Sequence, residues 1–65
     1  MKEIAKIEKS KDEVVVLVDR GEGYYERFVT WIQDTKGNNF WGHYFTDPLL
    51  ARVDFADRAG INGNR

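Results

Sequence analysis

The stretch Val14-Val15-Val16-Leu17-Val18 decides the fold of this 65-residue chain. It places five apolar residues in a row, and four of them are β-branched, which favours an extended backbone. An unbroken apolar run is typical of a strand that is buried on both faces. We therefore expect this segment to lie in the middle of a sheet, with a neighbouring strand on each edge.

The flanking sequence supplies three further strands, so that strands are predicted at about residues 3–9, 13–20, 24–33 and 39–45. The first of these is ambiguous, because Ile4 and Ile7 also have a helical spacing. An isolated helix of that length would be marginal, and alternating lysines and glutamates suit the exposed edge of a sheet. We therefore interpret residues 3–9 as a short edge strand.

Turn residues separate the predicted strands. Ser10-Lys11-Asp12 and Gly21-Glu22-Gly23 each indicate a turn. Residues 34–38 read as a five-residue hairpin loop, with Gly37 in the left-handed conformation. Within residues 24–33, the side chains divide by alternation into two sets on opposite faces: Tyr24, Glu26, Phe28, Thr30 and Ile32, against Tyr25, Arg27, Val29, Trp31 and Gln33.

A helix is predicted at about residues 48–59. Asp47 is a favourable N-cap, Pro48 suits the first helical position, and Gly60 supplies the C-terminal stop. Leu49, Val53 and Ala56 share one stripe of this helix with Leu50 beside it, Phe55 and Ala59 flank the other side, and Asp54, Asp57 and Arg58 are expected to face water. Residues 61–65 are expected to be loose.

These elements predict an α+β fold over one domain, residues 1–65: a four-stranded antiparallel meander with one C-terminal helix packed on one face. A single helix cannot cover both faces of such a sheet. With two Trp, three Tyr and four Phe in the chain, we expect an aromatic strip on the uncovered face, either exposed or covered by a partner. The predicted interaction surface is Tyr25, Arg27, Val29, Trp31, Trp41, His43 and Phe45.

The chemistry-bearing residues indicate no enzyme. Without cysteine, the chain can form no disulfide, zinc-thiolate cluster or cysteine nucleophile. His43 could act as a general base or ligand, but Ser10 is the only serine that could pair with it, so a structural histidine explains it better. His43 with Asp47, Asp54 and Asp57 matches no metal-ligand pattern. We therefore predict no catalytic residue, no metal and no cofactor.

Nucleic-acid binding is the alternative function. Arginines interleave with aromatic residues, and aromatic rings on an open sheet can stack bases while arginines hold phosphates. The residues concerned are Arg20, Arg27, Arg52 and Arg58 with Tyr24, Tyr25, Trp31 and Trp41. Acidic residues occupy the same segments, however, and the formal net charge is −1, so no basic stripe is visible.

A resemblance to a group of known proteins rests on three parts of the sequence. These are the segment Phe28-Val29-Thr30-Trp31, the block Phe40-Trp41-Gly42-His43-Tyr44-Phe45, and the helix residues Ala51, Asp54, Phe55 and Arg58. Over Tyr24 to Arg58, the chain resembles short uncharacterised proteins of bacterial conjugative elements and phages of Gram-positive hosts. The resemblance implies a cytosolic accessory protein of a mobile element, with no assigned reaction. The same block also has a physical reading, since Gly42 permits a close approach or a bulge, and Ala51 and Phe55 would seat the helix.

Together these observations predict a non-enzymatic protein-binding module that uses an aromatic sheet face. Its expected partner is a second copy of itself or a host protein. Single-stranded nucleic acid is the less favoured alternative. The chain contains no run of eighteen apolar residues, which a membrane-spanning helix would need. Lys2, Glu3 and Lys6 lie where a secretory signal would be apolar. We therefore expect a cytoplasmic protein.

Overall fold

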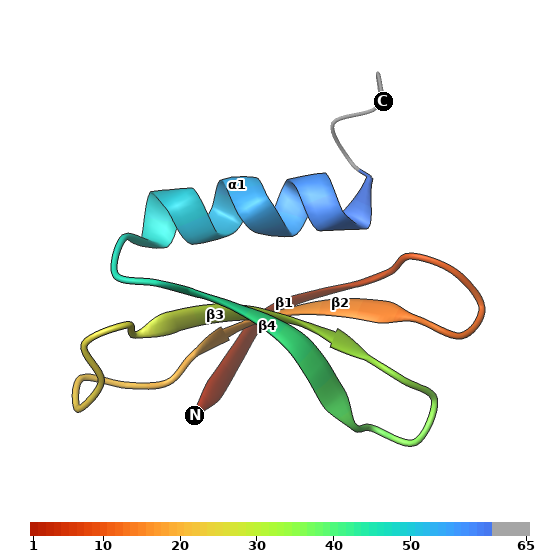
Figure 1. Cartoon of the computed structure of the whole chain (residues 1–65), viewed down its shortest axis with the longest axis horizontal. Helices are drawn as coiled ribbons and strands as arrows, with labels where there is room; N and C mark the ends of the chain where they lie inside the picture. The colour runs from red at the N-terminus through yellow and green to blue at the C-terminus, as the bar shows by residue number, and fades with distance from the viewer. Residues whose placement is uncertain (61–65) are drawn as a thin grey trace.

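The computed structural model describes residues 1–60 and shows a sheet with a helix laid across one face (Figure 1). Its elements are β1 (Lys2–Glu8), β2 (Val14–Asp19), β3 (Phe28–Gln33), β4 (Asn39–Phe45) and α1 (Pro48–Ala59). Each strand pairs antiparallel with the next along the chain, in the order β1-β2-β3-β4. The predicted α+β meander with one helix on one face is confirmed for these residues.

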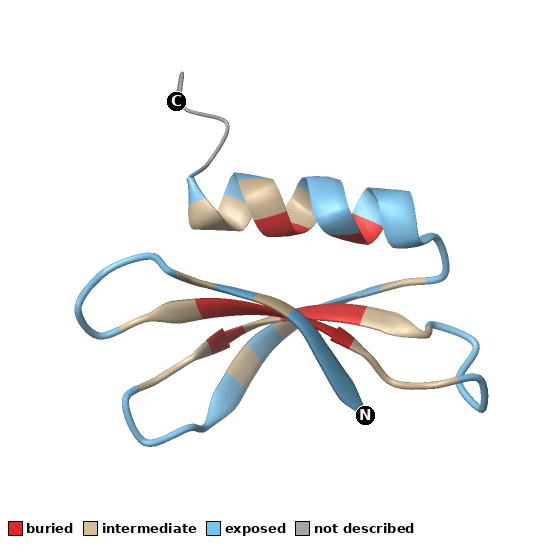
Figure 2. Cartoon of the chain, turned by 180° about the vertical axis from the view of Figure 1, so that it is seen from behind, coloured by how far each residue is buried: buried red, intermediate tan, exposed pale blue. Residues whose placement is uncertain are grey.

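The central position predicted for residues 14–18 is confirmed. β2 pairs with β1 on one edge and with β3 on the other. Val15 and Leu17 pack toward α1, whereas Val16 and Val18 pack on the opposite side of the sheet, which we call the far face. The buried residues of the strands concentrate in the middle of the sheet (Figure 2). Burial on both faces accounts for the unbroken apolar run at positions 14–18.

The predicted helix boundaries are also confirmed. The Asp47 carboxylate accepts a hydrogen bond from the backbone N–H of Leu49 at 2.8 Å, and Pro48 opens the helix. Gly60 ends it in the left-handed conformation, with φ 76°. The expected left-handed Gly37 is present in the hairpin loop as well, with φ 84°.

The orientation of α1 differs in part from the expectation. Ala51 and Phe55 are buried against the sheet, and Ala59 packs beside them. Asp54 and Arg58, which were expected to face water, are half-buried and bond to β3. The small Ala51 lets the helix approach the sheet closely, while Phe55 fills the space beyond it. The stripe that contains Leu49 and Val53 consequently points away from the sheet.

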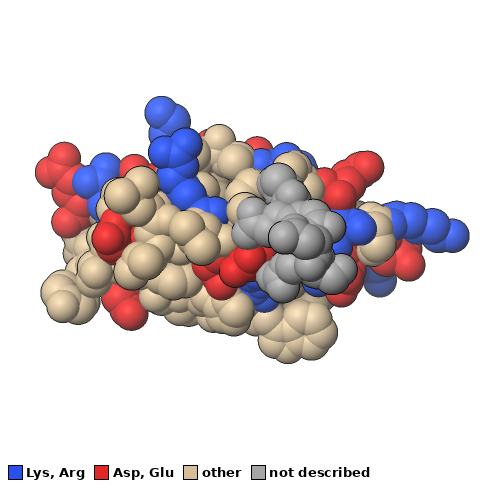
Figure 3. Space-filling view, turned by 90° about the horizontal axis from the view of Figure 1, so that it is seen from above, with Lys and Arg blue, Asp and Glu red and all other residues tan. Residues whose placement is uncertain are grey.

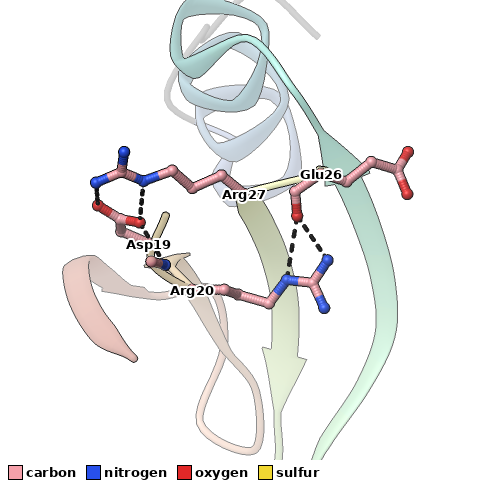
Figure 4. Close-up of polar contacts among 5 residues, drawn as sticks. Asp19, Arg20, Glu26 and Arg27 are labelled. Atoms are coloured by element: carbon pink, nitrogen blue, oxygen red, sulfur yellow. Dashed lines mark hydrogen bonds and ion pairs between the residues drawn. The ribbon is translucent and has the colours of Figure 1, made fainter. Parts of the chain in front are cut away.

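The third strand is shorter than predicted, because it begins at Phe28 and not at Tyr24. Residues 20–27 form a loop that is closed by Arg20, whose Nε and Nη2 donate to the Glu26 carbonyl at 3.1 and 2.6 Å (Figure 4). The first two strands differ from the predicted 3–9 and 13–20 by one residue at each end. The expected loose tail at residues 61–65 lies outside the described residues.

A bulge interrupts β4. Thr30 pairs with His43 and Ile32 with Phe40, so that Trp41 and Gly42 together stand opposite the single residue Trp31. Trp41 takes up the distortion with φ 55°, a left-handed conformation that bulky side chains rarely adopt. Gly42 meets the indole of Trp31 so closely that a Cβ at this position would lie 2.7 Å from Nε1. Glycine is therefore the residue that fits under this indole ring.

We predict that Gly42→Ala lowers the free energy of unfolding by about 1–3 kcal/mol, because the added methyl group must displace the Trp31 ring. Urea unfolding followed by tryptophan fluorescence measures the change. Gly23→Ala is the matched control: a Cβ there meets nothing within 4 Å, so its effect should stay within about 1 kcal/mol. Equal stability of the Gly42→Ala variant and the wild type would contradict the proposed close contact.

Candidate interaction surface

The far face already carries a cover made of the protein's own side chains. Val16, Val18 and Val29 are buried there, and Val29 is fully buried. The Trp31 ring packs against these valines. Trp31 in turn meets the ring of Tyr44 edge to face, with 6.5 Å between the ring centroids. The expected open aromatic strip is therefore in part a layer that shields the sheet.

Arg20 extends this cover toward the β2–β3 loop. Its guanidinium carbon lies 4.2 Å from the centroid of the Tyr24 ring and 4.8 Å from that of Tyr44. Both distances fall within the range of cation–π attraction. Because Arg20 also binds the Glu26 carbonyl, its side chain joins the loop to β4. Trp31, Tyr44, Arg20 and Tyr24 thus form a continuous row, which we call the far-face row.

The seven residues of the predicted surface do not form one surface in the structure. Val29 and Trp31 lie on the far face. Phe45 packs on the helix side, and His43 contacts α1. The remaining three lie at the periphery: Tyr25 is 90% exposed in the loop, Trp41 is 68% exposed at the bulge, and Arg27 is paired with Asp19. Two features explain the separation: the bulge reverses the alternation of β4 between Phe40 and His43, and Tyr25 and Arg27 lie in the loop before β3.

A polar network joins α1 to β3 and β4 on the helix side. The fully buried Thr30 hydroxyl donates to Asp54 Oδ2 at 2.6 Å and accepts from Arg58 Nη1 at 3.0 Å. Arg58 Nη1 also donates to the Thr30 carbonyl at 3.2 Å. His43 Nδ1 lies 3.0 Å from Asp54 Oδ2 and 3.2 Å from Oδ1. These contacts satisfy the one buried polar residue of the described core.

The chemistry of this network is that of a structural tie. A histidine bonded through Nδ1 to a carboxylate is the arrangement found in acid–base catalysis. The nearby hydroxyl, however, belongs to Thr30, which is fully buried and already bonded to Asp54 and Arg58. Within residues 1–60, no group of three or more acidic or histidine side chains is gathered as a metal site requires. The network fixes the position of the helix on the sheet.

A second polar contact joins the last residue of β2, Asp19, to Arg27, which directly precedes β3. The Arg27 guanidinium donates to both carboxylate oxygens of Asp19, at 2.7 and 2.9 Å (Figure 4). Asp19 also accepts from the backbone N–H of Gly21 at 2.8 Å. The hydrogen bonds from Arg27, followed by the one from Gly21, hold the pKa of Asp19 below its usual value. Three of the four arginines considered for phosphate binding, Arg20, Arg27 and Arg58, are therefore engaged within the protein.

The outward side of α1 is the surface that sequence reasoning passed over. Leu49, Leu50 and Val53 are 65%, 57% and 57% exposed, and we call these three residues the outer stripe. Viewed from the helix side, an uncharged area is bordered by residues of both charges (Figure 3). The stripe was visible in the sequence as Leu49, Val53 and Leu50. The predicted seat of the helix, Ala51 and Phe55, is confirmed, and it turns this stripe away from the sheet.

Comparison with known proteins gives no further guide to this surface. No protein-family model, curated protein or solved structure matches the chain. Within residues 1–60, no helix combines the length and apolar composition needed to cross a membrane.

Replacing Thr30 with valine tests the polar network. Thr30→Val keeps the shape but removes a buried hydroxyl that serves both Asp54 and Arg58, so we expect a loss of about 1–3 kcal/mol in the free energy of unfolding. His43→Gln, at the exposed end of the network, should cost less. Chemical denaturation of both variants provides the comparison. A larger loss for His43→Gln than for Thr30→Val would place the centre of the network at the histidine instead.

The Asp19–Arg27 pair predicts a dependence of stability on pH. A carboxyl whose pKa is lowered on folding adds stability above the pKa of its unfolded form, about 4, and loses that contribution as pH falls through the folded pKa. The stability gap between the wild type and Asp19→Asn should therefore be widest near pH 7 and narrow below about pH 4. The stability gap between the wild type and Arg27→Leu, which removes the main cause of the lowered pKa of Asp19, should narrow over the same pH range. Thermal unfolding measured from pH 7 down to acid checks both variants, and a gap independent of pH would contradict the assignment.

Proposed function

We propose that this protein is a non-enzymatic protein-binding module and that the outer stripe of α1 is its contact surface. The observation that carries the proposal is the exposure of Leu49, Leu50 and Val53, each more than half accessible, on one side of one helix. Burying such a side chain completely is worth about 1.5–3 kcal/mol. Contiguous exposed apolar residues with a polar rim are typical of protein interaction sites.

The distribution of the other apolar side chains supports this choice of surface. On the far face, Val16, Val18 and Val29 are already buried, and the Trp31 ring packs against them. On the helix side, Ala51 and Phe55 fill the space between helix and sheet. The outer stripe has no comparable cover among the described residues. The sheet face that the sequence suggested as the contact surface therefore has less to gain from a partner than the helix does.

The resemblance expected for residues 24–58, to short uncharacterised proteins of conjugative elements and phages, implies an accessory protein and agrees with the same class of function. Such a protein needs a binding surface and no reaction of its own. Nucleic-acid binding is the competing function, and the internal contacts of Arg20, Arg27 and Arg58 weigh against it. It enters the experiment below as an outcome that would overturn the proposal.

The experiment compares the tagged full chain with a double variant, Leu49→Gln/Val53→Gln, which removes apolar surface while keeping good helix-forming residues. Lysate from cells that carry the gene is treated with nuclease and captured on each protein, and untagged copies of the chain are included. We expect a captured protein that the double variant loses. Binding of the purified pair should then be at least tenfold weaker for the double variant.

Tyr25→Gln is the matched control, since Tyr25 is exposed but lies in the β2–β3 loop away from α1. This variant should bind as the wild type does. A labelled single-stranded oligonucleotide is titrated in parallel at about 50 mM salt, where phosphate contacts are strong. Capture that survives the double variant, or oligonucleotide binding without any captured protein, would overturn the proposal.

A further inference from the structure

β1 forms one edge of the described sheet, where it pairs with β2 alone. An edge strand carries a row of backbone N–H and C=O groups that its own sheet leaves unpaired. Lys9 directs its N–H toward β2, since it donates to the Glu13 carbonyl at 2.9 Å. These groups alternate in direction along a strand. The backbone groups of Glu8 and Lys6 therefore point outward, away from β2.

Bulges limit how much of each sheet edge is open to another strand. In β1, a bulge separates Glu3 from Ala5, whereas the residues from Ala5 to Glu8 pair with β2 without interruption. The opposite edge, β4, is interrupted in its middle at Trp41 and Gly42. A bulge disrupts the ladder and hinders pairing with a further strand. The outer half of β1 is therefore the longest regular stretch of open edge in the described sheet.

The side chains of this stretch carry charges of opposite sign. Lys6 and Glu8 stand opposite Val16 and Val14 in the register, and directly opposite residues share a face of the sheet. Val14 and Val16 pack on the far face, so Lys6 and Glu8 project there as well. Both are exposed, and neither forms an ion pair within residues 1–60. Each is thus available to a partner.

One antiparallel register of two β1 strands matches these charges. Outward-facing residues must meet outward-facing residues, because they exchange the hydrogen bonds. Lys6 opposite Lys6, or Glu8 opposite Glu8, would place like charges face to face, which is destabilising. Lys6 opposite Glu8 brings opposite charges together, and two-fold symmetry makes this pair twice. Ile7 then lies at the two-fold axis, beside its own counterpart.

The apolar residues on the helix side of β1 favour the same register. Ile7 pairs with Val15 and packs, like Ala5, against the core under α1. The helix packs mainly over β2, β3 and β4, so Ile7 and Ala5 are only half-buried. Ile7 of a second copy would extend the cover of these side chains across the axis.

From these observations we propose that a second copy of this chain pairs with the β1 edge, antiparallel and with Lys6 opposite Glu8 of the other copy. Each Lys6–Glu8 pair exchanges both of its backbone hydrogen bonds. One continuous sheet then runs through both copies, with both helices on the same face. The outer stripe takes no part in this contact and stays open to another partner.

The shortness of the open stretch limits the strength of this dimer. Few residues of each copy take part, which places the interface below about 1,200 Å², in the class of weak and transient association. The exposed ion pairs set the register more than the affinity. The dimer therefore forms at high micromolar to millimolar concentration.

Sedimentation equilibrium of the full chain from about 10 μM to 1 mM tests the association. We expect a change from monomer to dimer for the wild type. Lys6→Glu and Glu8→Lys each place like charges face to face and should weaken the dimer about tenfold, whereas the combined variant Lys6→Glu/Glu8→Lys should restore it. Lys11→Glu is the matched control: it makes the same charge change in the turn after β1 and should dimerise as the wild type does.

Lys6→Pro tests the backbone hydrogen bonds of the dimer. Because the N–H of Lys6 points outward, proline at this position removes no bond to β2, and edge strands accept proline in such a place. We expect a monomer at every concentration, with the circular dichroism of the wild type. The charge variants test the same contact without any change of the backbone.

Disulfide trapping tests the register, because the chain has no cysteine of its own. In the proposed register, the two Ile7 residues form a non-hydrogen-bonded pair, with Cα atoms about 4.5 Å apart, a separation that a disulfide can span. Ile7→Cys should therefore give a linked dimer under mild oxidation, and Tyr25→Cys, in the β2–β3 loop, should stay largely unlinked. Failure of Ile7→Cys to link at concentrations where the wild type dimerises would overturn the proposal.

The outcomes separate this inference from the proposed function. The outer-stripe variant Leu49→Gln/Val53→Gln should dimerise as the wild type does. A wild type that stays monomeric at about 1 mM would overturn the self-association and leave the binding function in place. A dimer that the outer-stripe variant abolishes and Lys6→Pro leaves unchanged would also overturn the pairing through β1, while it would support the outer stripe as a contact surface.

Discussion

The structure depends on the burial of β2 from both sides. Val15 and Leu17 pack under α1, while Val16 and Val18 lie on the far face, so the strand needs two layers of cover in a chain of 65 residues. The helix supplies one layer. The far-face row supplies the other from side chains alone, with the indole of Trp31 against the valines. A domain of this size buries a comparatively small share of its surface. Side chains must therefore cover the sheet face that the helix does not.

This division of cover determines where apolar surface remains. The aromatic residues of the far-face row contact one another or Arg20, although Tyr24 and Tyr44 stay exposed. The helix meets the sheet through Ala51 and Phe55, and the polar contacts of Asp54 and Arg58 with Thr30 fix its rotation. The rotation in turn directs the outer stripe into solvent. The proposed contact surface is thus a consequence of how the helix is held.

Local signals predicted most of the fold, and tertiary contacts account for the rest. The run at residues 14–18 and the caps Asp47 and Gly60 act within a few residues, so the sequence reveals them directly. In the loop before β3, Arg20 binds the Glu26 carbonyl, a contact between residues six apart. The bulge of β4, which Gly42 was expected to permit, also requires Trp41 to adopt a left-handed backbone. Neither feature changes the pattern of apolar residues in the sequence. Together they separate the residues of the predicted aromatic surface. The seat of the helix, Ala51 and Phe55, was predicted and is confirmed, but the exposure of the opposite stripe was not inferred from it.

The meander also bears on how the chain reaches this structure. Every strand pairs with its neighbour in the sequence, and such short-range pairing closes small loops, which is the condition for rapid folding. The contacts of α1 span far more of the chain, because Ala51 and Phe55 pack in one cluster with Val15 and Leu17. The sheet can therefore assemble hairpin by hairpin as residues emerge from a ribosome, and the docking of α1 completes the process.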